Sequence, residues 1–351
     1  MPWLGPLERL LTDPDVSEIM VVNARMFAES RGRLELTGLG FTDDHSVRAV
    51  VEQIVTPHGV RFDQSCPLLD ARLPDGSRVN AIFPPLAIKG SSVTIRKHPR
   101  PPLTLADLTR SGAMTTQMAT FLEGAVKLRK NVVISGGAAS GKTTLLNALS
   151  ALLPAHERIV TVEDAAELYL SQPHAVSLDA HPPTFDGKGE YSVRDLVKHA
   201  LRMRPDRIVV GECRGGEAVE LVQAANTGHA GIMTTIHADS PLRAVARIER
   251  LCHLAALNLP VRVVRQQIAS SAQIMIHQCR FSDGRRRITC IAEVVGIDDG
   301  GDVEPREIFG FKVARIGPSG EVEGEFYATG YRHSFVEQFS AHGLETDGAR
   351  G

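Results

Sequence analysis

A glycine-rich octapeptide near the middle of the chain has the residue types that bind a triphosphate. It fits the pattern G-x-x-x-x-G-K-[ST] and consists of Gly136, Gly137, Ala138, Ala139, Ser140, Gly141, Lys142 and Thr143. Glycines allow backbone angles at which successive N–H groups converge on phosphate oxygens, and the helix start that follows adds partial positive charge. Lys142 can reach the β- and γ-phosphates, and the Thr143 hydroxyl can ligate Mg²⁺. We therefore expect the octapeptide, together with Thr144, to bind ATP and Mg²⁺.

Two apolar segments end in carboxylates that suit the hydrolysis of a phosphate bond. Glu212 follows the strand-like segment 206–210, where it can polarise a water for attack on the γ-phosphate or hold Mg²⁺ through water. The alternative for Glu212 is a helix cap or an ion pair. Glu163 follows segment 158–162, and we expect it to face the metal or the attacking water, whereas Asp164 is equally suited to capping the next turn. The pattern predicts Glu212 and Glu163 as catalytic residues, with Glu163 also binding metal.

Two histidines and two arginines complete the candidate site. His237 ends segment 232–237, where it can donate a hydrogen bond to the γ-phosphate, and His229 precedes that segment as a further nucleotide-binding candidate. Arg78 and Arg96 lie on the last strand-like segments before a proline-rich break. An arginine from a neighbouring domain or subunit can stabilise the charge that develops in phosphoryl transfer, although a surface ion pair is the commoner role.

The elements around these residues form an α/β pattern. Residues 1–97 mix short strands and helices and predict a smaller N-terminal α/β domain. Residues 98–109, which contain Pro99-Arg100-Pro101-Pro102, predict a linker. Within residues 110–295, helices alternate with apolar strands, which predicts a parallel sheet with helices on both faces and ligands at the carboxyl ends of its strands. Residues 296–351 predict a C-terminal extension of strands and a short helix.

Composition argues against nucleic-acid binding, zinc binding and membrane-spanning segments. The 351 residues are 43% hydrophobic and carry a formal net charge of −2, so a sizeable core is expected and no global basic field favours nucleic acid as a partner. The five cysteines form no C-x-x-C pair, which argues against zinc. No apolar run approaches the length of a membrane span and no signal peptide is visible, so we expect a soluble protein whose membrane role is peripheral.

Taken together, the motifs resemble those of the type II/type IV secretion ATPase superfamily. The octapeptide matches its Walker A motif, and the Asp box, the Walker B motif ending in Gly-Glu and the His box have similar counterparts at residues 161–168, 207–212 and 227–239. The segments most similar to the branch that assembles Flp (tight adherence) pili are 70–80, 94–97 and 201–217. This branch is close to the conjugation and type IV secretion ATPases. The tetracysteine zinc motif common in type II secretion and pilus-extension ATPases is absent.

The resemblance implies a RecA-like P-loop NTPase core joined by a short linker to the N-terminal α/β domain. It implies a homo-hexamer that binds ATP between the two domains and near a subunit interface, where Arg78 and Arg96 match interdomain or intersubunit arginines. It further implies a cytoplasmic ATP hydrolase, peripheral to the inner face of the cell membrane. Such an enzyme drives pilus assembly or protein secretion through an integral membrane platform protein.

Several alternatives stay open at this point. One is a nucleotide-gated assembly module with little hydrolysis, against which Glu163, Glu212 and His237 argue. Another is a conjugation or type IV secretion ATPase, or a DNA-translocating motor; the net charge and the 5% aromatic content disfavour the DNA-translocating motor. A small-molecule P-loop kinase is the weakest rival. The sequence leaves open the transported substrate, the direction of action, the platform partner, the ring stoichiometry and which arginine crosses the interface.

Overall fold

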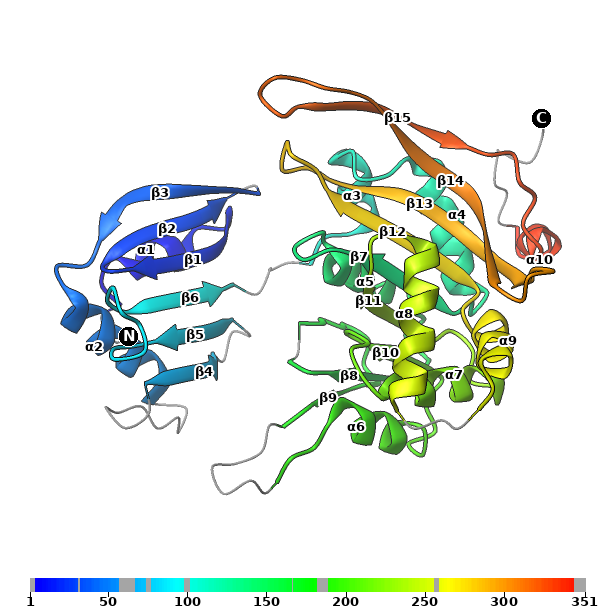
Figure 1. Cartoon of the computed structure of the whole chain (residues 1–351), viewed down its shortest axis with the longest axis horizontal. Helices are drawn as coiled ribbons and strands as arrows, with labels where there is room; N and C mark the ends of the chain where they lie inside the picture. Colours follow the sequence, from blue (N-terminus) through cyan, green and yellow to red (C-terminus); the bar gives the residue numbers. More distant parts are fainter. Residues whose placement is uncertain are drawn as a thin grey trace. The chain divides into compact units, whose positions relative to one another are not determined.

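The computed structural model describes residues 4–30, 32–56, 67–73, 77–97, 102–165, 167–181, 189–255 and 259–343. It divides into two compact units, Met1–Pro101 and Pro102–Gly351 (Figure 1). The boundary lies inside the predicted linker of residues 98–109, but the residues after it are not a linker. Helix α3 (Leu105–Arg110) buries Leu105 and Leu108 in the core of the second unit. The second unit therefore begins before residue 110.

The first unit contains a six-stranded sheet in the order β3-β2-β1-β6-β5-β4, in which neighbouring strands are antiparallel. The strands are β1 (Val16–Val22), β2 (Arg25–Ser30), β3 (Arg33–Gly40), β4 (Leu68–Arg72), β5 (Arg78–Ile82) and β6 (Ser92–Arg96). Among the described residues of this unit, two helices accompany the sheet, α1 (Leu7–Thr12) and α2 (Asp44–Val55). The predicted helix start near residues 42–45 is confirmed, because Asp43 and Ser46 form a capping box there. The predicted turn at Pro74-Asp75-Gly76 lies outside the described residues.

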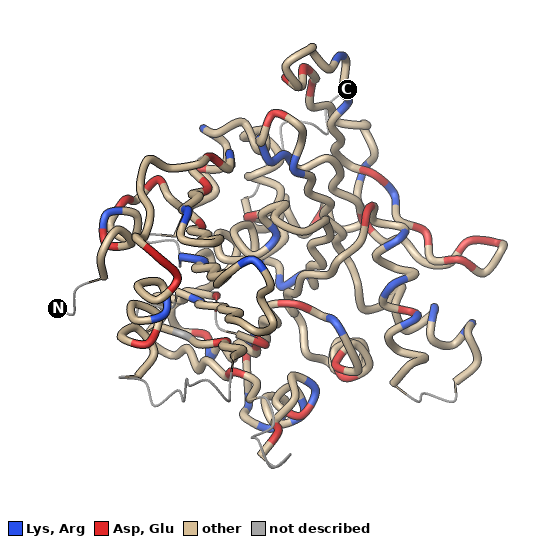
Figure 2. The backbone as a smooth tube through the Cα atoms, turned by 60° about the vertical axis from the view of Figure 1, so that its left-hand side comes forward, with Lys and Arg blue, Asp and Glu red and all other residues tan. Residues whose placement is uncertain are grey.

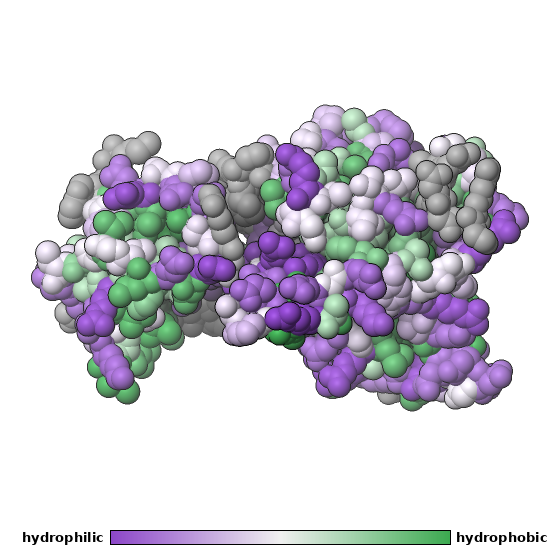
Figure 3. Space-filling view, turned by 90° about the horizontal axis from the view of Figure 1, so that it is seen from above, coloured by the Kyte–Doolittle hydropathy of each residue, from purple (hydrophilic) through white to green (hydrophobic). Residues whose placement is uncertain are grey.

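The core of the first unit comes from alternating apolar residues on the strands and a helical stripe on α2. Ile19 and Val21 of β1 are buried, as are Val47 and Val51 of α2. Figure 3 shows hydrophobic surface on this unit. The exposed large apolar side chains among its described residues are Val22, Leu34, Leu36, Leu68, Leu86 and Ile88. The sequence analysis did not predict β3, whose leucines Leu34 and Leu36 alternate with charged residues but are exposed.

The second unit is built on a nine-stranded sheet in the order β15-β14-β13-β12-β7-β11-β10-β8-β9. From β12 to β9 all neighbouring strands are parallel, as predicted for this region. Strands β13, β14 and β15 then extend the sheet in antiparallel fashion, so the sheet is mixed rather than parallel. The strands are β7 (Val132–Gly136), β8 (Ile159–Glu163), β9 (Ala175–Asp179), β10 (Arg207–Val210), β11 (Met233–His237), β12 (Ile274–Arg280), β13 (Arg286–Ile297), β14 (Val303–Ile316) and β15 (Val322–Ala328).

The predicted C-terminal extension, residues 296–351, is not a separate region. Strand β13 crosses the predicted boundary, and β14 and β15 continue the same sheet. Helix α10 (Val336–Ala341) returns to the core, where the Phe339 ring stacks on Phe121 of α4 (Thr116–Lys127) at 5.7 Å between centroids. The segment after β12 is therefore part of the larger unit.

Helices cover both faces of the large sheet, as predicted (Figure 1). On β7, Val132 and Ile134 face one apolar cluster, whereas Val133 faces the other. The first cluster includes residues of α3, α4, α5 (Lys142–Ser150) and α10. The second includes residues of α6 (Val193–Ala200), α7 (Glu217–Asn226), α8 (Pro241–Leu254) and α9 (Val261–Ser271). Burial on both faces explains why these strands read as continuous apolar runs.

Charge and hydropathy place two further limits on the molecule. Basic and acidic residues are interspersed along the chain, in keeping with its small net charge (Figure 2). Among the described residues, no helix has both the length and the apolar character needed to cross a membrane.

Candidate nucleotide site

The glycine-rich loop joins the carboxyl end of β7 to the amino end of α5, as its motif predicts. Gly141 is the N-cap of α5 and has a φ of 94°, in the left-handed region that glycine tolerates. Gly136 has no room for a side chain, because an added Cβ would lie 2.4 Å from the backbone oxygen of Gln278 and 2.5 Å from Ser140 Oγ. The backbone of the loop therefore depends on glycine at both ends of the motif.

Lys142 is folded over this loop. Its side-chain Nζ donates to the backbone oxygens of Gly136 at 3.1 Å and Gly137 at 2.8 Å. Ser140 Oγ is buried and has no hydrogen-bond partner among the described residues. Thr143 and Thr144 lie in the first turn of α5, where the helix presents its partial positive charge. A buried hydroxyl without a partner, a lysine and a helix start fit a bound phosphate group.

Glu212 and His237 meet at the same edge of the sheet, as predicted. Glu212 follows β10, and its Oε1 lies 3.1 Å from Nε2 of His237, the last residue of β11. His237 pairs in register with Gly136, so it lies beside the glycine-rich loop. The other carboxylate oxygen of Glu212 accepts a hydrogen bond from Arg214 at 2.8 Å, and Arg214 also lies 3.3 Å from Asp164. The carboxyl ends of three neighbouring parallel strands thus bring a carboxylate, a histidine and the glycine-rich loop together.

The electrostatics of this edge follow from its charges. Burial lowers the pKa of His237, the positive charge of Lys142 lowers it further, and Glu212 opposes both effects. His237 is therefore neutral at neutral pH and can donate or accept one hydrogen bond at each ring nitrogen. The hydrogen bond to Glu212 raises the pKa of Arg214, which stays charged.

Glu163 lies at the predicted strand end but faces backbone amides. It is 2% exposed, and its Oε1 accepts hydrogen bonds from the N–H groups of Glu167 at 2.8 Å and Leu168 at 3.0 Å. Gly211 leaves space for it, since an added Cβ there would lie 3.0 Å from Glu163 Cγ. Burial raises the pKa of Glu163 to about 7. In this state Glu163 holds the loop after β8, and its metal-binding and catalytic roles stay predictions.

Arg78 and Arg96 are neighbours in the first unit. They pair directly across the antiparallel strands β5 and β6, so both side chains lie on one face. Each forms an ion pair with a carboxylate, with Arg78 4.0 Å from Asp70 and Arg96 3.7 Å from Glu18. The roles expected for Arg78 and Arg96 at the nucleotide stay predictions.

The structure does not bring His229 to this site. His229 lies between α7 and the amino end of β11, whereas His237 lies at the carboxyl end of that strand. A five-residue strand separates the two positions, a length of roughly 13–17 Å. The prediction that His229 binds the nucleotide is therefore not supported within one subunit.

Three residues that sequence reasoning did not assign to the site also lie here. Arg214 bonds to Glu212, Arg286 Nε donates to the backbone oxygen of Ala139 at 2.9 Å, and Gln278 lies against Gly136 and Gly141. Gln278 is 2% exposed and pairs in register with Gly136. For Arg286, the run Arg285-Arg286-Arg287 was a signal in the sequence. It could not be assigned to the site because β12 and β13 were not predicted as strands beside the loop.

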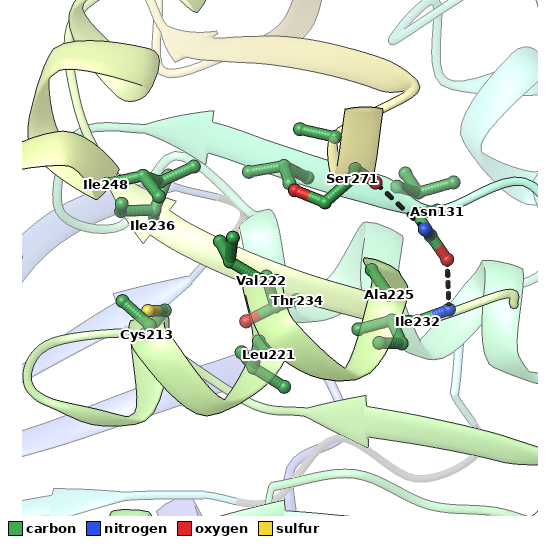
Figure 4. A pocket seen from close by; sticks show the side chains of 14 residues that line it. Asn131, Cys213, Leu221, Val222, Ala225, Ile232, Thr234, Ile236, Ile248 and Ser271 are labelled. Atoms are coloured by element: carbon green, nitrogen blue, oxygen red, sulfur yellow. Dashed lines mark hydrogen bonds between the residues drawn. The ribbon is translucent and has the colours of Figure 1, made fainter. Parts of the chain in front are cut away.

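An apolar cavity of about 40 Å³ lies between strands β7 and β11 and helices α7, α8 and α9, within the second unit (Figure 4). Cys213, the residue after Glu212, contributes to its wall beside Val222 and Ile248. Asn131 also lines it, but both ends of its amide are occupied, by Ser271 O at 2.8 Å and by the N–H of Ile232 at 2.8 Å. The lining offers no charged group, so the cavity is a packing void rather than a second reactive site.

Comparison with known proteins agrees with these features. Residues 3–298 match the family described as "Type II/IV secretion system protein". A putative conjugal transfer protein of Mycobacterium tuberculosis is 37% identical over 295 residues, covering 82% of this chain and 83% of that protein. The type IV secretion system protein VirB11 of Bartonella henselae is 31% identical over 329 residues, covering 82% of this chain and 90% of that protein.

Solved structures show the same fold. The ATPase DotB of Legionella pneumophila superposes with a TM-score of 0.61 at 21% identity, over 85% of this chain and 82% of that one. The pilus retraction motor PilT with bound ADP superposes with a TM-score of 0.60 at 18% identity, over 86% of this chain and 85% of that one. The predicted two-domain, RecA-like architecture is thereby confirmed. With the family match spanning most of its length, the chain belongs to the type II/IV secretion system protein family.

Proposed function

We propose that this chain is the ATP-hydrolysing subunit of a machine that assembles pili or secretes proteins. The observation that carries the proposal is the meeting of Lys142, Glu212 and His237 at one edge of a RecA-like sheet. Family membership supports the ATPase class, since the DotB and PilT structures are described as an ATPase and a motor.

The residues suggest a division of labour in hydrolysis. The glycine-rich loop and Lys142 hold the phosphates, and the Thr143 hydroxyl would hold Mg²⁺, which neutralises phosphate charge. Glu212 accepts a proton from a water whose oxygen attacks the γ-phosphorus, while the bond from that phosphorus to the β–γ bridging oxygen breaks. His237, neutral and next to Glu212, is placed to hydrogen-bond the γ-phosphate or the water.

The first test compares ATP turnover of the wild type with that of Glu212→Gln. Because the amide cannot accept the proton, we expect turnover to fall by about 10²–10⁴-fold while ATP still binds. Glu123→Gln is the matched control, since Glu123 makes only a surface pair with Lys127 among the described contacts and should leave turnover unchanged. Unchanged turnover in Glu212→Gln would contradict the assignment. Binding without turnover in the wild type would instead favour a nucleotide-gated assembly module.

We further propose a homo-hexamer in which Arg78 or Arg96 acts on ATP bound by a neighbouring subunit. Their direct pairing on one face of the first unit supports a shared anionic ligand. Native mass spectrometry with ATP tests the stoichiometry. Mixing Arg96→Ala with Glu212→Gln tests the direction, because two inactive proteins recover turnover together only if the arginine acts across subunits. Equally inactive mixtures would place the arginine in its own subunit.

We propose a membrane platform protein as partner, at the inner face of the cell membrane, and Flp pilus assembly as the process. Segments 70–80 and 201–217 support the Flp branch. Conjugation or type IV secretion is the second candidate, because relatives named as conjugal transfer and VirB11 proteins are 37% and 31% identical. Interspersed charges disfavour a motor that tracks DNA itself (Figure 2). A salt-dependent shift of labelled DNA with the purified protein would favour it.

A further inference from the structure

Ala139, at the apex of the glycine-rich loop, has an unusual backbone conformation. Its φ is 54°, in the left-handed region where a residue with a Cβ is strained. Four other described residues besides glycine share a positive φ, but only Ala139 lies in the glycine-rich loop; the others are Asn23, Ala24, Arg129 and Arg204. Such a conformation persists only when surrounding contacts hold it.

Arg286 supplies such a contact. Its Nε donates to the backbone oxygen of Ala139 at 2.9 Å. Its Cδ lies 3.1 Å from the position that a Cβ on Gly141 would occupy, so the side chain lies across the loop from residue 139 to residue 141. Arg286 is half-buried and comes from β13, far along the chain from the loop.

The hairpin of β12 and β13 fixes the place of Arg286. Its neighbour Arg287 is buried, bonds to Asp283 at 3.0 Å and stacks over the rings of Phe281 and Phe311. Successive side chains of a strand point to opposite faces. With Arg287 locked on one face, Arg286 is directed to the other, toward the loop.

The base of the same hairpin is tied to the strand that enters the loop. Ser135 Oγ and His277 Nδ1 lie 3.0 Å apart, and His277 Nε2 lies 3.2 Å from Cys279 Sγ. Burial lowers the pKa of His277, so its imidazole is neutral at neutral pH. The hairpin therefore contacts this region at two points. His277 contacts Ser135 on the strand that enters the loop, and Arg286 bonds to Ala139 at the loop apex.

We propose that Arg286 is a positioning residue of the nucleotide site, which holds the strained apex of the loop in the shape that binds phosphate. The inference rests on the proposed nucleotide-binding function. Without Arg286, the loop can relax at Ala139, and its amides must be reordered when phosphate arrives. The cost falls on binding rather than on the chemical step, since Arg286 acts through the backbone of Ala139.

Nucleotide affinity of the full chain tests the role of Arg286. We expect Arg286→Ala to raise the Kd for ADP and for ATP alike by about tenfold, with kcat at saturating ATP within about twofold of the wild type. Arg285→Ala is the matched control: it removes the same charge from the exposed neighbouring residue and should leave both Kd values within about twofold. Arg286→Lys keeps the charge and a hydrogen-bond donor. Its Kd values should lie between those of the wild type and those of Arg286→Ala.

A double-mutant cycle tests the link to backbone strain. Glycine adopts the left-handed conformation without strain, so Ala139→Gly should make the apex less dependent on Arg286. We expect the loss caused by Arg286→Ala to shrink from about tenfold to about twofold in the Ala139→Gly background. Thermal unfolding of each variant shows whether the fold is intact.

Three outcomes would overturn the inference while leaving the proposed function in place. They are equal affinities in Arg286→Ala and Arg285→Ala, an undiminished loss in the Ala139→Gly background, and a loss for ATP without a loss for ADP. The last would mean that Arg286 contacts the γ-phosphate directly. Failure of the wild type to bind either nucleotide would overturn the proposed function, and this inference with it.

Discussion

The two edges of the large sheet each carry a carboxylate held by arginines, in very different surroundings. At the amino ends of the strands, Glu157 binds both Arg129 and Arg207, and the side chains of Glu157 and Arg207 are 5% and 1% exposed. At the carboxyl ends, Glu212 binds Arg214, and their side chains are 18% and 58% exposed. A carboxylate–guanidinium pair is therefore buried at one edge, which we call the sealed cluster (Glu157 and Arg207), and reaches solvent at the other, which we call the open cluster (Glu212 and Arg214).

Burial explains what each cluster can do. Burial alone would raise the pKa of Glu157, yet hydrogen bonds from Arg207 and Arg129 leave that pKa below its ordinary value. Glu157 and Arg207 cannot exchange partners without leaving a charge unpaired in the protein interior, whereas the Arg129 side chain is 43% exposed. Arg214 and Glu212 reach solvent and can exchange partners at little cost. The sealed cluster is therefore suited to holding the fold and the open one to chemistry.

Removing the buried arginine is the strongest test of whether the Glu157–Arg207 pair stabilises the fold. Arg207→Met leaves Glu157 buried with only half of its partners, and we expect the free energy of unfolding to fall by about 3–5 kcal/mol. Urea denaturation measures the change, with Arg214→Met as the control that removes an exposed partner. A loss below about 1 kcal/mol in Arg207→Met would show that the buried pair is not structural.

Glu163 is a buried carboxylate at the same edge as Glu212, and its raised pKa should make the free energy of unfolding depend on pH. The described residues give it no ion pair, and burial raises its pKa to about 7 from 4.5. A raised pKa in the folded state means that this group favours folding below pH 4.5, and that the benefit is lost as pH rises through about 7. The loss amounts to about 3 kcal/mol, at about 1.4 kcal/mol per pKa unit.

Glu163→Gln should remove this pH dependence while keeping an oxygen that accepts from the amides of residues 167 and 168. We expect the variant to be more stable than the wild type at pH 8 and similar at pH 4.5. Urea unfolding across this range measures the difference. Parallel curves for the two proteins would mean that Glu163 has an ordinary pKa.

Arg214 tests whether the open cluster contributes to chemistry rather than stability. Because its ion pairs are exposed, Arg214→Ala should change the free energy of unfolding by less than about 1 kcal/mol. We expect turnover to fall by about tenfold, since Glu212 loses the partner that orients it. Arg243→Ala, which breaks another exposed pair with Asp239, is the control and should alter neither quantity. Equal turnover in the two variants would contradict the role.

The smallest expected effect concerns the apolar cavity between β7, β11 and helices α7 to α9. Cys213 is 3% exposed, and burial raises the pKa of its thiol well above the ordinary value, so the native thiol should resist labelling. Cys213→Val adds apolar volume toward the 40 Å³ cavity and should change stability by less than about 1 kcal/mol, with turnover unchanged. Denaturation and ATPase assays check both. A large loss of turnover would show that packing behind Glu212 controls the site.

Local patterns were sufficient for much of this protein. The octapeptide placed a phosphate-binding loop between a strand and a helix, and the apolar runs before Glu212 and His237 predicted strands that end at one edge. Periodicity did not predict β3, β9 or the pairing of β12 with β13. Strand β9 is at the sheet edge and β3 exposes leucines, so neither has the fully apolar pattern of a central strand. The boundary between the two units lies within the predicted linker, but α3 already begins at Leu105, because a proline-rich run does not show where packing resumes.

By itself, the sequence determined the loop chemistry, the alternation of helices and strands and the edge at which Glu212 and His237 meet. These follow from short segments, since a motif and a buried strand carry their own signals. Only the tertiary structure decided that Glu163 faces amides and that Arg286 bonds to Ala139. Those outcomes depend on register and on contacts between segments far apart in the chain, which local periodicity does not encode.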